Sequence, residues 1–111
     1  MARTIIANGT VVTATDRVPA DVLVEDEKIV ALAAPGSHDW TADETIDAAG
    51  KYVIPGGIDV HTHMELPFGG TFASDTFETG SRAAAWGGTT TIVDFAVQSR
   101  GGGLMEGYEA W

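Results

Sequence analysis

Residues 58 to 96 carry a strand, helix, strand pattern, and no other feature of the sequence limits the possible folds as strongly. Residues 58–63 form a short β-prone run, residues 74–86 are helical in character, and residues 89–96 are rich in β-branched residues. Such a unit pairs its two strands in parallel through a right-handed crossover. A two-stranded parallel sheet cannot bury both of its faces, so we expect this alternation to continue beyond a truncated chain.

Local signals mark the ends of the expected helices. Ser74 or Asp75 can cap the first helix, and Glu78 stands three residues after Asp75, as in a capping box. Gly87-Gly88 ends that helix. Residues 104–111 begin a further amphipathic helix. We therefore expect β/α alternation throughout the second half of the chain.

The first half of the chain contains β-strand signals and no helical pattern. The expected strands are residues 4–7, 10–14, 21–25 and 28–33, followed by a loop over 34–45 and one or two short strands within 45–54. Asn8-Gly9 predicts a hairpin turn, because this dipeptide is the strongest short hairpin signal. Asp26-Glu27 predicts the second turn, although Glu27 suits a positive φ poorly.

Composition excludes several classes of partner. The formal net charge is -10, from 16 acidic against 6 basic residues, so we expect neither nucleic acid nor an anionic membrane as a partner. There is no apolar run of about 20 residues, and the N-terminus lacks a secretory h-region. We therefore expect a cytoplasmic protein. The absence of cysteine leaves histidine and carboxylates as the strong metal ligands.

His61-Thr62-His63 is the candidate metal-binding sequence. Residues two apart on a strand project to the same face, so both imidazoles can reach one ion while Thr62 points away. As an isolated pattern, His-x-His is more often a coincidence than a ligand pair. On the first strand of a barrel, however, these residues would stand at the C-terminal end, where barrels build their active sites.

The residues around the histidines carry a family resemblance. Residues 55–63, Pro-Gly-Gly-Ile-Asp-Val-His-Thr-His, resemble the start-of-barrel signature of the amidohydrolase superfamily. The dihydropyrimidinase/hydantoinase branch in particular is similar over further segments, namely residues 64–71, 73–77 and 87–91, with residues 8–12 and 21–24 in the β-rich half. The resemblance thus covers essentially the whole chain.

The resemblance implies an α/β fold with an N-terminal β-rich segment. Residues 1–55 would be an incomplete N-terminal β-sandwich segment. Residues 56–111 would be the truncated start of a TIM-like (β/α)8 barrel, with its first βαβ unit. The whole protein would then be a metal-dependent hydrolase that opens a cyclic amide or ureide, and it would commonly assemble as a tetramer. We expect the 111-residue chain alone to be inactive.

The resemblance also implies a cofactor of two divalent metals, usually zinc, bridged by a carboxylated lysine and a hydroxide. His61 and His63 match two ligands of the more buried metal. The bridging lysine, two further histidines and an aspartate would lie beyond Trp111. Lys28, Lys51 and His38 belong to the β-rich half and cannot replace them.

Neighbouring residues have candidate roles around the substrate and the histidines. Met64, Leu66 and Phe68 resemble a loop that lines the pocket for the exocyclic group of the substrate, and ordinary packing at the barrel rim is an equal alternative. Asp94, in an otherwise apolar strand, is a candidate to hold an imidazole N–H. For Asp59 we favour a solvated or capping role.

Related families remain as alternatives. Dihydroorotases and allantoinases typically carry a Glu-Pro-Gly or similar stretch after the histidines, and the former often an arginine, whereas residues 64–68 hold no positive charge. Dihydroorotase is therefore disfavoured, and an allantoinase-like enzyme is the enzymatic alternative. The non-catalytic scaffolds of the collapsin-response mediator type have lost metal ligands, but both histidines are present here.

Overall fold

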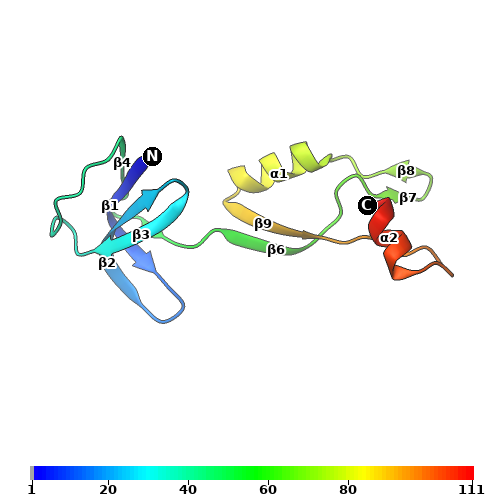
Figure 1. Cartoon of the computed structure of the whole chain (residues 1–111), viewed down its shortest axis with the longest axis horizontal. Helices are drawn as coiled ribbons and strands as arrows, with labels where there is room; N and C mark the ends of the chain where they lie inside the picture. The colour runs from blue at the N-terminus through cyan, green and yellow to red at the C-terminus, as the bar shows by residue number, and fades with distance from the viewer. Residues whose placement is uncertain (1) are drawn as a thin grey trace. The chain divides into compact units, whose positions relative to one another are not determined.

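The computed structural model describes residues 2–111, apart from the side chain of Phe68. The chain forms two compact units, Met1–Pro55 and Gly56–Trp111. Strands make up the first unit, and the second contains both strands and helices (Figure 1). No helix among residues 2–111 is both long and apolar enough to cross a membrane. The chain is therefore β-rich, with its helices confined to the second unit.

The first unit is a five-stranded sheet. Its strands are β1 (Arg3–Val12), β2 (Arg17–Glu25), β3 (Lys28–Ala33), β4 (Glu44–Asp47) and β5 (Tyr52–Val53). The order is β3-β2-β1-β4, and β5 also pairs with β1. The pairs β1/β2 and β2/β3 are antiparallel, whereas β4 and β5 run parallel to β1. Ile5, Val11, Val22 and Leu23 are buried in this unit.

The predicted hairpin at Asn8-Gly9 is wrong. β1 continues through this dipeptide as one strand, and its register against β2 shifts between Ile6 and Gly9. Asn8 has the positive φ of 63° that a tight turn would use, but here it forms a bulge. A Cβ on Gly9 would lie 2.5 Å from Cγ2 of Val53, so glycine allows β5 to approach. The turn between β1 and β2 is instead closed by Thr13, whose N–H donates to the Asp16 carbonyl at 2.8 Å.

The second predicted hairpin is confirmed. Asp26 and Glu27 connect β2 to β3 with φ of 44° and 68°, so Glu27 does adopt the conformation that its side chain disfavours. The loop after β3 and the two short strands that follow it also agree with the prediction. The two-residue spacing therefore outweighs the poor turn propensity of Glu27.

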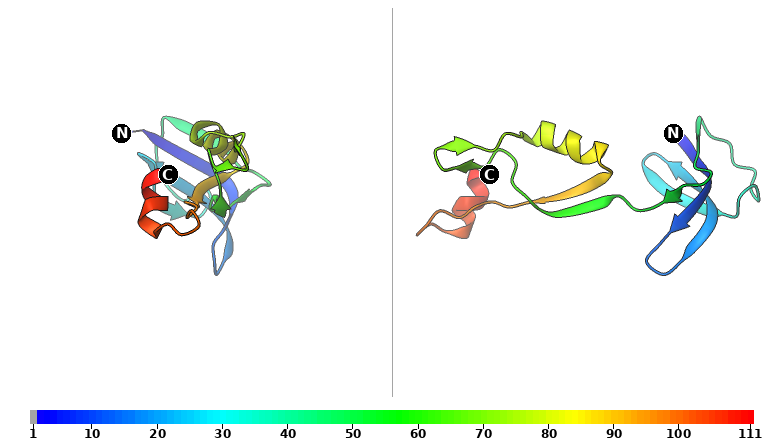
Figure 2. Two further views of the ribbon diagram at one scale, coloured as in Figure 1. Left: turned by 90° about the vertical axis from the view of Figure 1, so that its right-hand side faces the viewer. Right: turned by 180° about the vertical axis from the view of Figure 1, so that it is seen from behind.

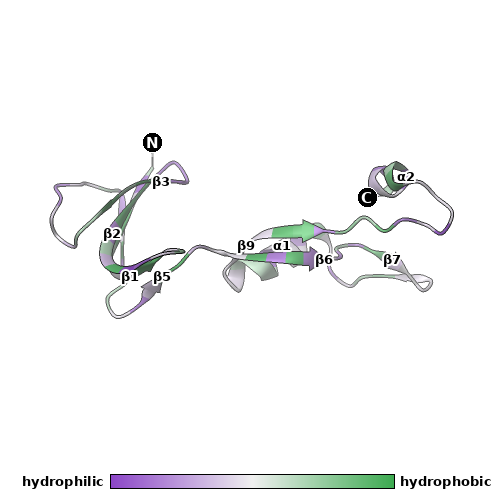
Figure 3. Cartoon of the chain, turned by 90° about the horizontal axis from the view of Figure 1, so that it is seen from below, coloured by the Kyte–Doolittle hydropathy of each residue, from purple (hydrophilic) through white to green (hydrophobic). Residues whose placement is uncertain are grey.

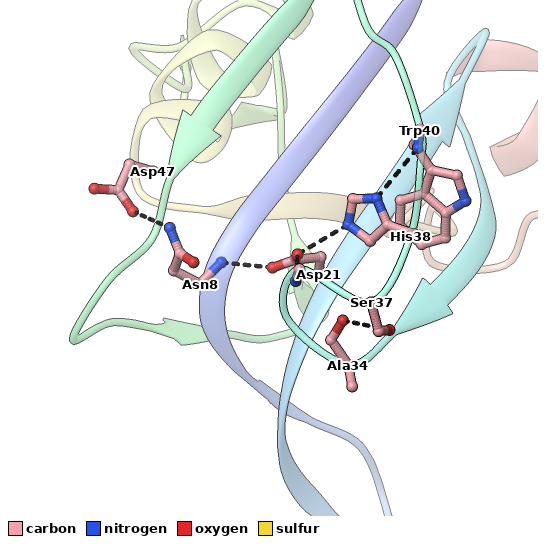
Figure 4. Close-up of polar contacts among 8 residues, drawn as sticks. Asn8, Asp21, Ala34, Ser37, His38, Trp40 and Asp47 are labelled. Carbon is pink, nitrogen blue, oxygen red and sulfur yellow. Dashed lines mark hydrogen bonds and ion pairs between the residues drawn. The ribbon is translucent and has the colours of Figure 1, made fainter.

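A buried carboxylate ties three segments of the first unit together. Asp21 is 4% exposed, and its Oδ1 accepts the N–H of Asn8 at 2.7 Å. Its Oδ2 accepts the N–H of Gly36 at 3.1 Å and lies 2.9 Å from Nε2 of His38. The His38 ring stacks on Trp40 at 3.9 Å (Figure 4). Asp21 on β2 thus holds both the β1 bulge and the loop after β3.

Acid should weaken this network. The N–H of Asn8 lowers the pKa of the Asp21 carboxyl from its ordinary value of 3.8; burial opposes the shift, and Gly36 and His38 add to it. A carboxyl with a lowered folded-state pKa stabilises the fold above its unfolded pKa, and that stability is lost as pH falls below about 4 through the folded value. We expect the urea midpoint for unfolding of β1 and β2, measured by NMR, to fall as the pH is lowered from 5 to 3. The fall should be shallower in Asp21→Asn, and equal slopes would contradict the prediction.

The second unit begins with the predicted strand, helix, strand pattern. It contains β6 (Gly57–Thr62), β7 (Pro67–Phe68), β8 (Thr71–Phe72), α1 (Phe77–Trp86), β9 (Thr89–Asp94) and α2 (Leu104–Ala110). β6 and β9 pair in parallel, and α1 lies along this pair (Figures 1 and 2). β6 alternates apolar and polar residues (Figure 3). The parallel pairing, the helix ending at Gly87 and the further helix are confirmed.

Two local features differ from the sequence prediction. An antiparallel hairpin, β7/β8, forms around Gly69-Gly70, both with positive φ, where no strand was predicted. The cap of α1 is Thr76 rather than Ser74 or Asp75. Thr76 Oγ1 accepts the N–H of Thr79 at 3.1 Å, and Thr79 Oγ1 accepts the N–H of Thr76 at 2.9 Å. Thr76 and Thr79 therefore form the capping box that the sequence had suggested for Asp75 and Glu78.

Candidate functional site

The imidazoles of His61 and His63 converge at the end of β6. Their Nε2 atoms lie 3.1 Å apart, and the ring centroids lie 5.0 Å apart at an interplanar angle of 69°. β6 ends at Thr62, so His61 belongs to the strand and His63 follows it directly. The two rings thus lie on one side, as the period of a strand predicts.

The spacing of these nitrogens suits a shared cation. Zinc binds histidine nitrogen at about 2.0–2.1 Å, so nitrogens 3.1 Å apart would subtend roughly 100° at one ion, close to a tetrahedral angle. Among residues 2–111 the structure shows no group of three or more His, Cys, Asp or Glu side chains that could hold a metal. Within this described part, His61 and His63 therefore offer a pair of adjacent ligand positions.

Asp94 lies beside the histidine pair but does not bind either ring. Its Oδ1 accepts the Thr62 hydroxyl at 2.7 Å and the Met64 N–H at 3.0 Å, and its Oδ2 accepts Nε1–H of Trp111. Asp94 pairs in register with Thr62, and its carboxylate accepts hydrogen bonds from the residues on either side of His63. The predicted role of Asp94 in holding an imidazole N–H stays a prediction; among the described residues its Oδ1 holds the Thr62 side chain and the Met64 backbone, on either side of His63.

The surroundings of Asp94 favour its ionised form. Burial raises the pKa of its carboxyl, but the hydrogen bonds from Thr62, Trp111 and Met64 together outweigh burial and hold the pKa below 3.8. Nδ1 of His63 is buried and has no hydrogen-bond partner among residues 2–111. In this described part of the chain, therefore, no acceptor orients the His63 ring through its second nitrogen.

Phe95 was not predicted as a site residue. Its ring stacks on His61 with centroids 4.3 Å apart and planes 24° apart, and its N–H donates to the Thr62 carbonyl at 3.0 Å. The available signal was its position directly after Asp94, at the same edge of the parallel pair as the histidines. Phe95 thus covers one face of a candidate ligand.

The candidate pocket residues differ in their placement. Met64 lines a cavity of about 170 Å³, with Phe72, Phe77 and Trp111 among the other walls. Leu66 is half-buried and is not part of this wall. The side chain of Phe68 lies outside the described residues. Of the three candidates, only Met64 is therefore seen to face a cavity.

Glu65 anchors the loop after the histidines to α1. It has a φ of 55°, a conformation that non-glycine residues rarely adopt. Its N–H donates to the Asp75 carbonyl at 2.9 Å, and its Oε1 accepts the N–H of Phe77 at 3.1 Å. No local sequence signal marked this role, because it depends on the approach of α1.

Gly80 of α1 packs closely against the Met64 side chain, and replacing Gly80 tests this contact. A Cβ at this buried position of α1 would collide with Sδ and Cε of Met64. Gly80→Ala gains about 1 kcal/mol of helix propensity, but overpacking costs about 1–3 kcal/mol. The colliding atoms are the flexible end of the Met64 side chain, which can move aside, so the two effects should nearly offset each other. We expect little net change of stability in urea and a shifted Met64 methyl resonance. The exposed neighbour Ser81→Ala should leave that resonance in place, and an unshifted resonance in Gly80→Ala would contradict the contact.

Comparisons with known proteins place these features in context. The model of the family described as "Amidohydrolase family" matches residues 52–109. A D-hydantoinase of Streptomyces coelicolor is 65% identical over 98% of this chain and 24% of its own length. The dihydropyrimidinase of Rattus norvegicus is 46% identical over 98% of this chain and 22% of its own. The chain thus spans about a quarter of the length of these relatives.

Solved structures agree with the sequence relatives. The crystal structure of dihydropyrimidinase from Brevibacillus agri superposes with a TM-score of 0.85 at 52% identity, covering 98% of this chain and 23% of that one. A D-hydantoinase from Bacillus sp. AR9 gives a TM-score of 0.84 at 52% identity, over 97% and 23%. The fold of the described residues is thus found as a part of longer enzymes of this kind.

Proposed function

This chain belongs to the amidohydrolase family, and from that premise we propose that the whole protein is a metal-dependent hydrolase that opens the ring of hydantoins or dihydropyrimidines. The observation that carries the proposal is the 3.1 Å separation of the His61 and His63 Nε2 atoms. It occurs in a chain whose relatives are named D-hydantoinase and dihydropyrimidinase.

His61 and His63 would hold the cation, and we infer zinc because its bond length suits their spacing. A divalent cation polarises a carbonyl oxygen and lowers the pKa of a bound water. A catalytic zinc site typically has three protein ligands, so the chain alone should not be active. A second metal would bind beside the first. The bridging carboxylated lysine and the remaining ligands would be residues outside this chain.

We propose that residues 56–111 begin a (β/α)8 barrel and that residues 1–55 are an incomplete β-sandwich segment. The parallel β6/β9 pair supports the barrel, as does the exposure of Ile58 (65%) and Val60 (66%) on β6, since barrel strands are normally covered on both faces. Met64 would line the substrate pocket. Cytoplasmic location and tetrameric assembly stay predictions.

The test is ring opening by the whole protein reconstituted with zinc. Hydantoin, dihydrouracil and allantoin should be supplied in parallel, with the 111-residue chain as the inactive comparison. We expect turnover of hydantoin or dihydrouracil that a chelator removes and zinc restores. Preferential turnover of allantoin would favour the allantoinase-like alternative. Absence of both bound metal and turnover would favour a scaffold and overturn the proposal.

A further inference from the structure

The backbone of His63 lies beyond the hydrogen-bond ladder that holds β6. Thr62 and Asp94 are the last residues paired between β6 and β9, and the register shifts between Asp59 and Thr62. One carboxylate oxygen of Asp94 accepts both the Thr62 hydroxyl at 2.7 Å and the Met64 N–H at 3.0 Å. These two donors flank His63, so the Asp94 side chain holds the backbone at the point where the backbone hydrogen bonds between β6 and β9 end.

The Asp94 carboxylate is itself fixed. Its second oxygen accepts Nε1–H of Trp111, and the side chain is half-buried. Hydrogen bonds to an ionised acceptor are stronger than those between neutral groups. Two donors from the segment around His63 and one from Trp111 therefore set the plane of this carboxylate, and through it the backbone on both sides of His63.

The ring of His61 is held by a different contact, the stacked ring of Phe95. His61 is exposed, so packing within β6 does not restrict it. Phe95 stacks on this ring at 4.3 Å, and the Phe95 backbone is tied to the Thr62 carbonyl at 3.0 Å. The aromatic face thus limits the directions in which His61 can point.

We propose that Asp94 and Phe95, at the end of β9, are positioning residues that aim His63 and His61 at one point. The inference rests on the proposed function of the histidines as metal ligands. A metal site requires ligands whose rotamers are fixed by surrounding contacts, and loss of such supporting contacts typically weakens metal binding about 10–100-fold. Asp94 and Phe95 supply such contacts from adjacent residues of one strand end.

The first test measures zinc affinity of the whole protein by competition with a chelator. Asp94→Ala, Thr62→Val and Phe95→Leu should each weaken affinity about 10–100-fold and alter the visible spectrum of the cobalt-substituted protein. Asp94→Asn keeps an acceptor oxygen, and Phe95→Tyr keeps the ring, so both should recover most of the affinity. Glu78→Gln, whose charged side chain is exposed in the same unit, should match the wild type. A general loss of stability would lower the melting temperature without changing the cobalt spectrum.

The second test needs no metal. In the metal-free protein the ring current of Phe95 should shift the His61 ring protons upfield, and Phe95→Leu should abolish that shift. Unchanged affinity, cobalt spectrum and ring-proton shifts in the Asp94 and Phe95 variants would overturn the inference. If the His61→Ala variant still lost zinc in that case, the proposed function would stand and only the positioning role of Asp94 and Phe95 would fall. A wild-type protein that binds no zinc would overturn the proposed function. The ring-proton shifts alone would then decide whether Phe95 positions the His61 ring.

Discussion

Replacing either His61 or His63 by alanine in the whole protein should reduce zinc affinity by more than about 100-fold, with a parallel loss of ring-opening activity. Loss of a supporting contact costs about 10–100-fold, and loss of a ligand should exceed it. The two Nε2 atoms lie 3.1 Å apart, so neither ring alone can supply the pair of ligand positions. Metal content by atomic emission and turnover at saturating substrate would measure both effects.

The matched control for this prediction is His38→Gln. His38 belongs to the other compact unit and contacts Asp21 instead of the histidine pair. We expect its replacement to leave metal content unchanged while weakening the first unit. Equal metal loss in His38→Gln, or full metal retention in His61→Ala, would exclude a site made by His61 and His63.

Asp21→Ala should destabilise the first unit by about 1–3 kcal/mol, because removing the buried acceptor leaves its donors without a hydrogen-bond partner in the protein. The N–H groups of Asn8 and Gly36 and the His38 ring would all lose their contact with the carboxylate. Domains are stable by only about 5–15 kcal/mol. The variant should therefore lose hydrogen-exchange protection along β1 and β2.

The exposed Asp39 offers the control for that effect. Asp39→Ala lies in the same loop as His38 and should change stability by no more than about 0.5 kcal/mol. Asp21→Asn retains an acceptor oxygen and should fall between the two. Wild-type exchange protection in Asp21→Ala would show that the carboxylate does not hold the bulge.

The same local signal succeeded and failed in different contexts. Asp26-Glu27 forms its predicted turn, although Glu27 is a poor residue for a φ of 68°. Asn8-Gly9 has a stronger turn signal but forms a bulge, because Asp21 captures the Asn8 N–H at 2.7 Å and β5 packs on Gly9. A dipeptide determines which backbone conformations are accessible, and contacts with distant strands decide which one is used.

The histidine pair divides in a similar way between sequence and tertiary structure. The alternation of a strand placed His61 and His63 on one side, and the strand, helix, strand pattern required β6 and β9 to be parallel; both follow from the sequence alone. The contacts of Asp94 and Phe95 did not follow. Thr62 and Asp94 are 32 residues apart, and a shift of one residue in the pairing of β6 with β9 would turn either side chain to the opposite face. Local periodicity determines which side chains share a face, but only the register of the folded sheet decides which of them meet.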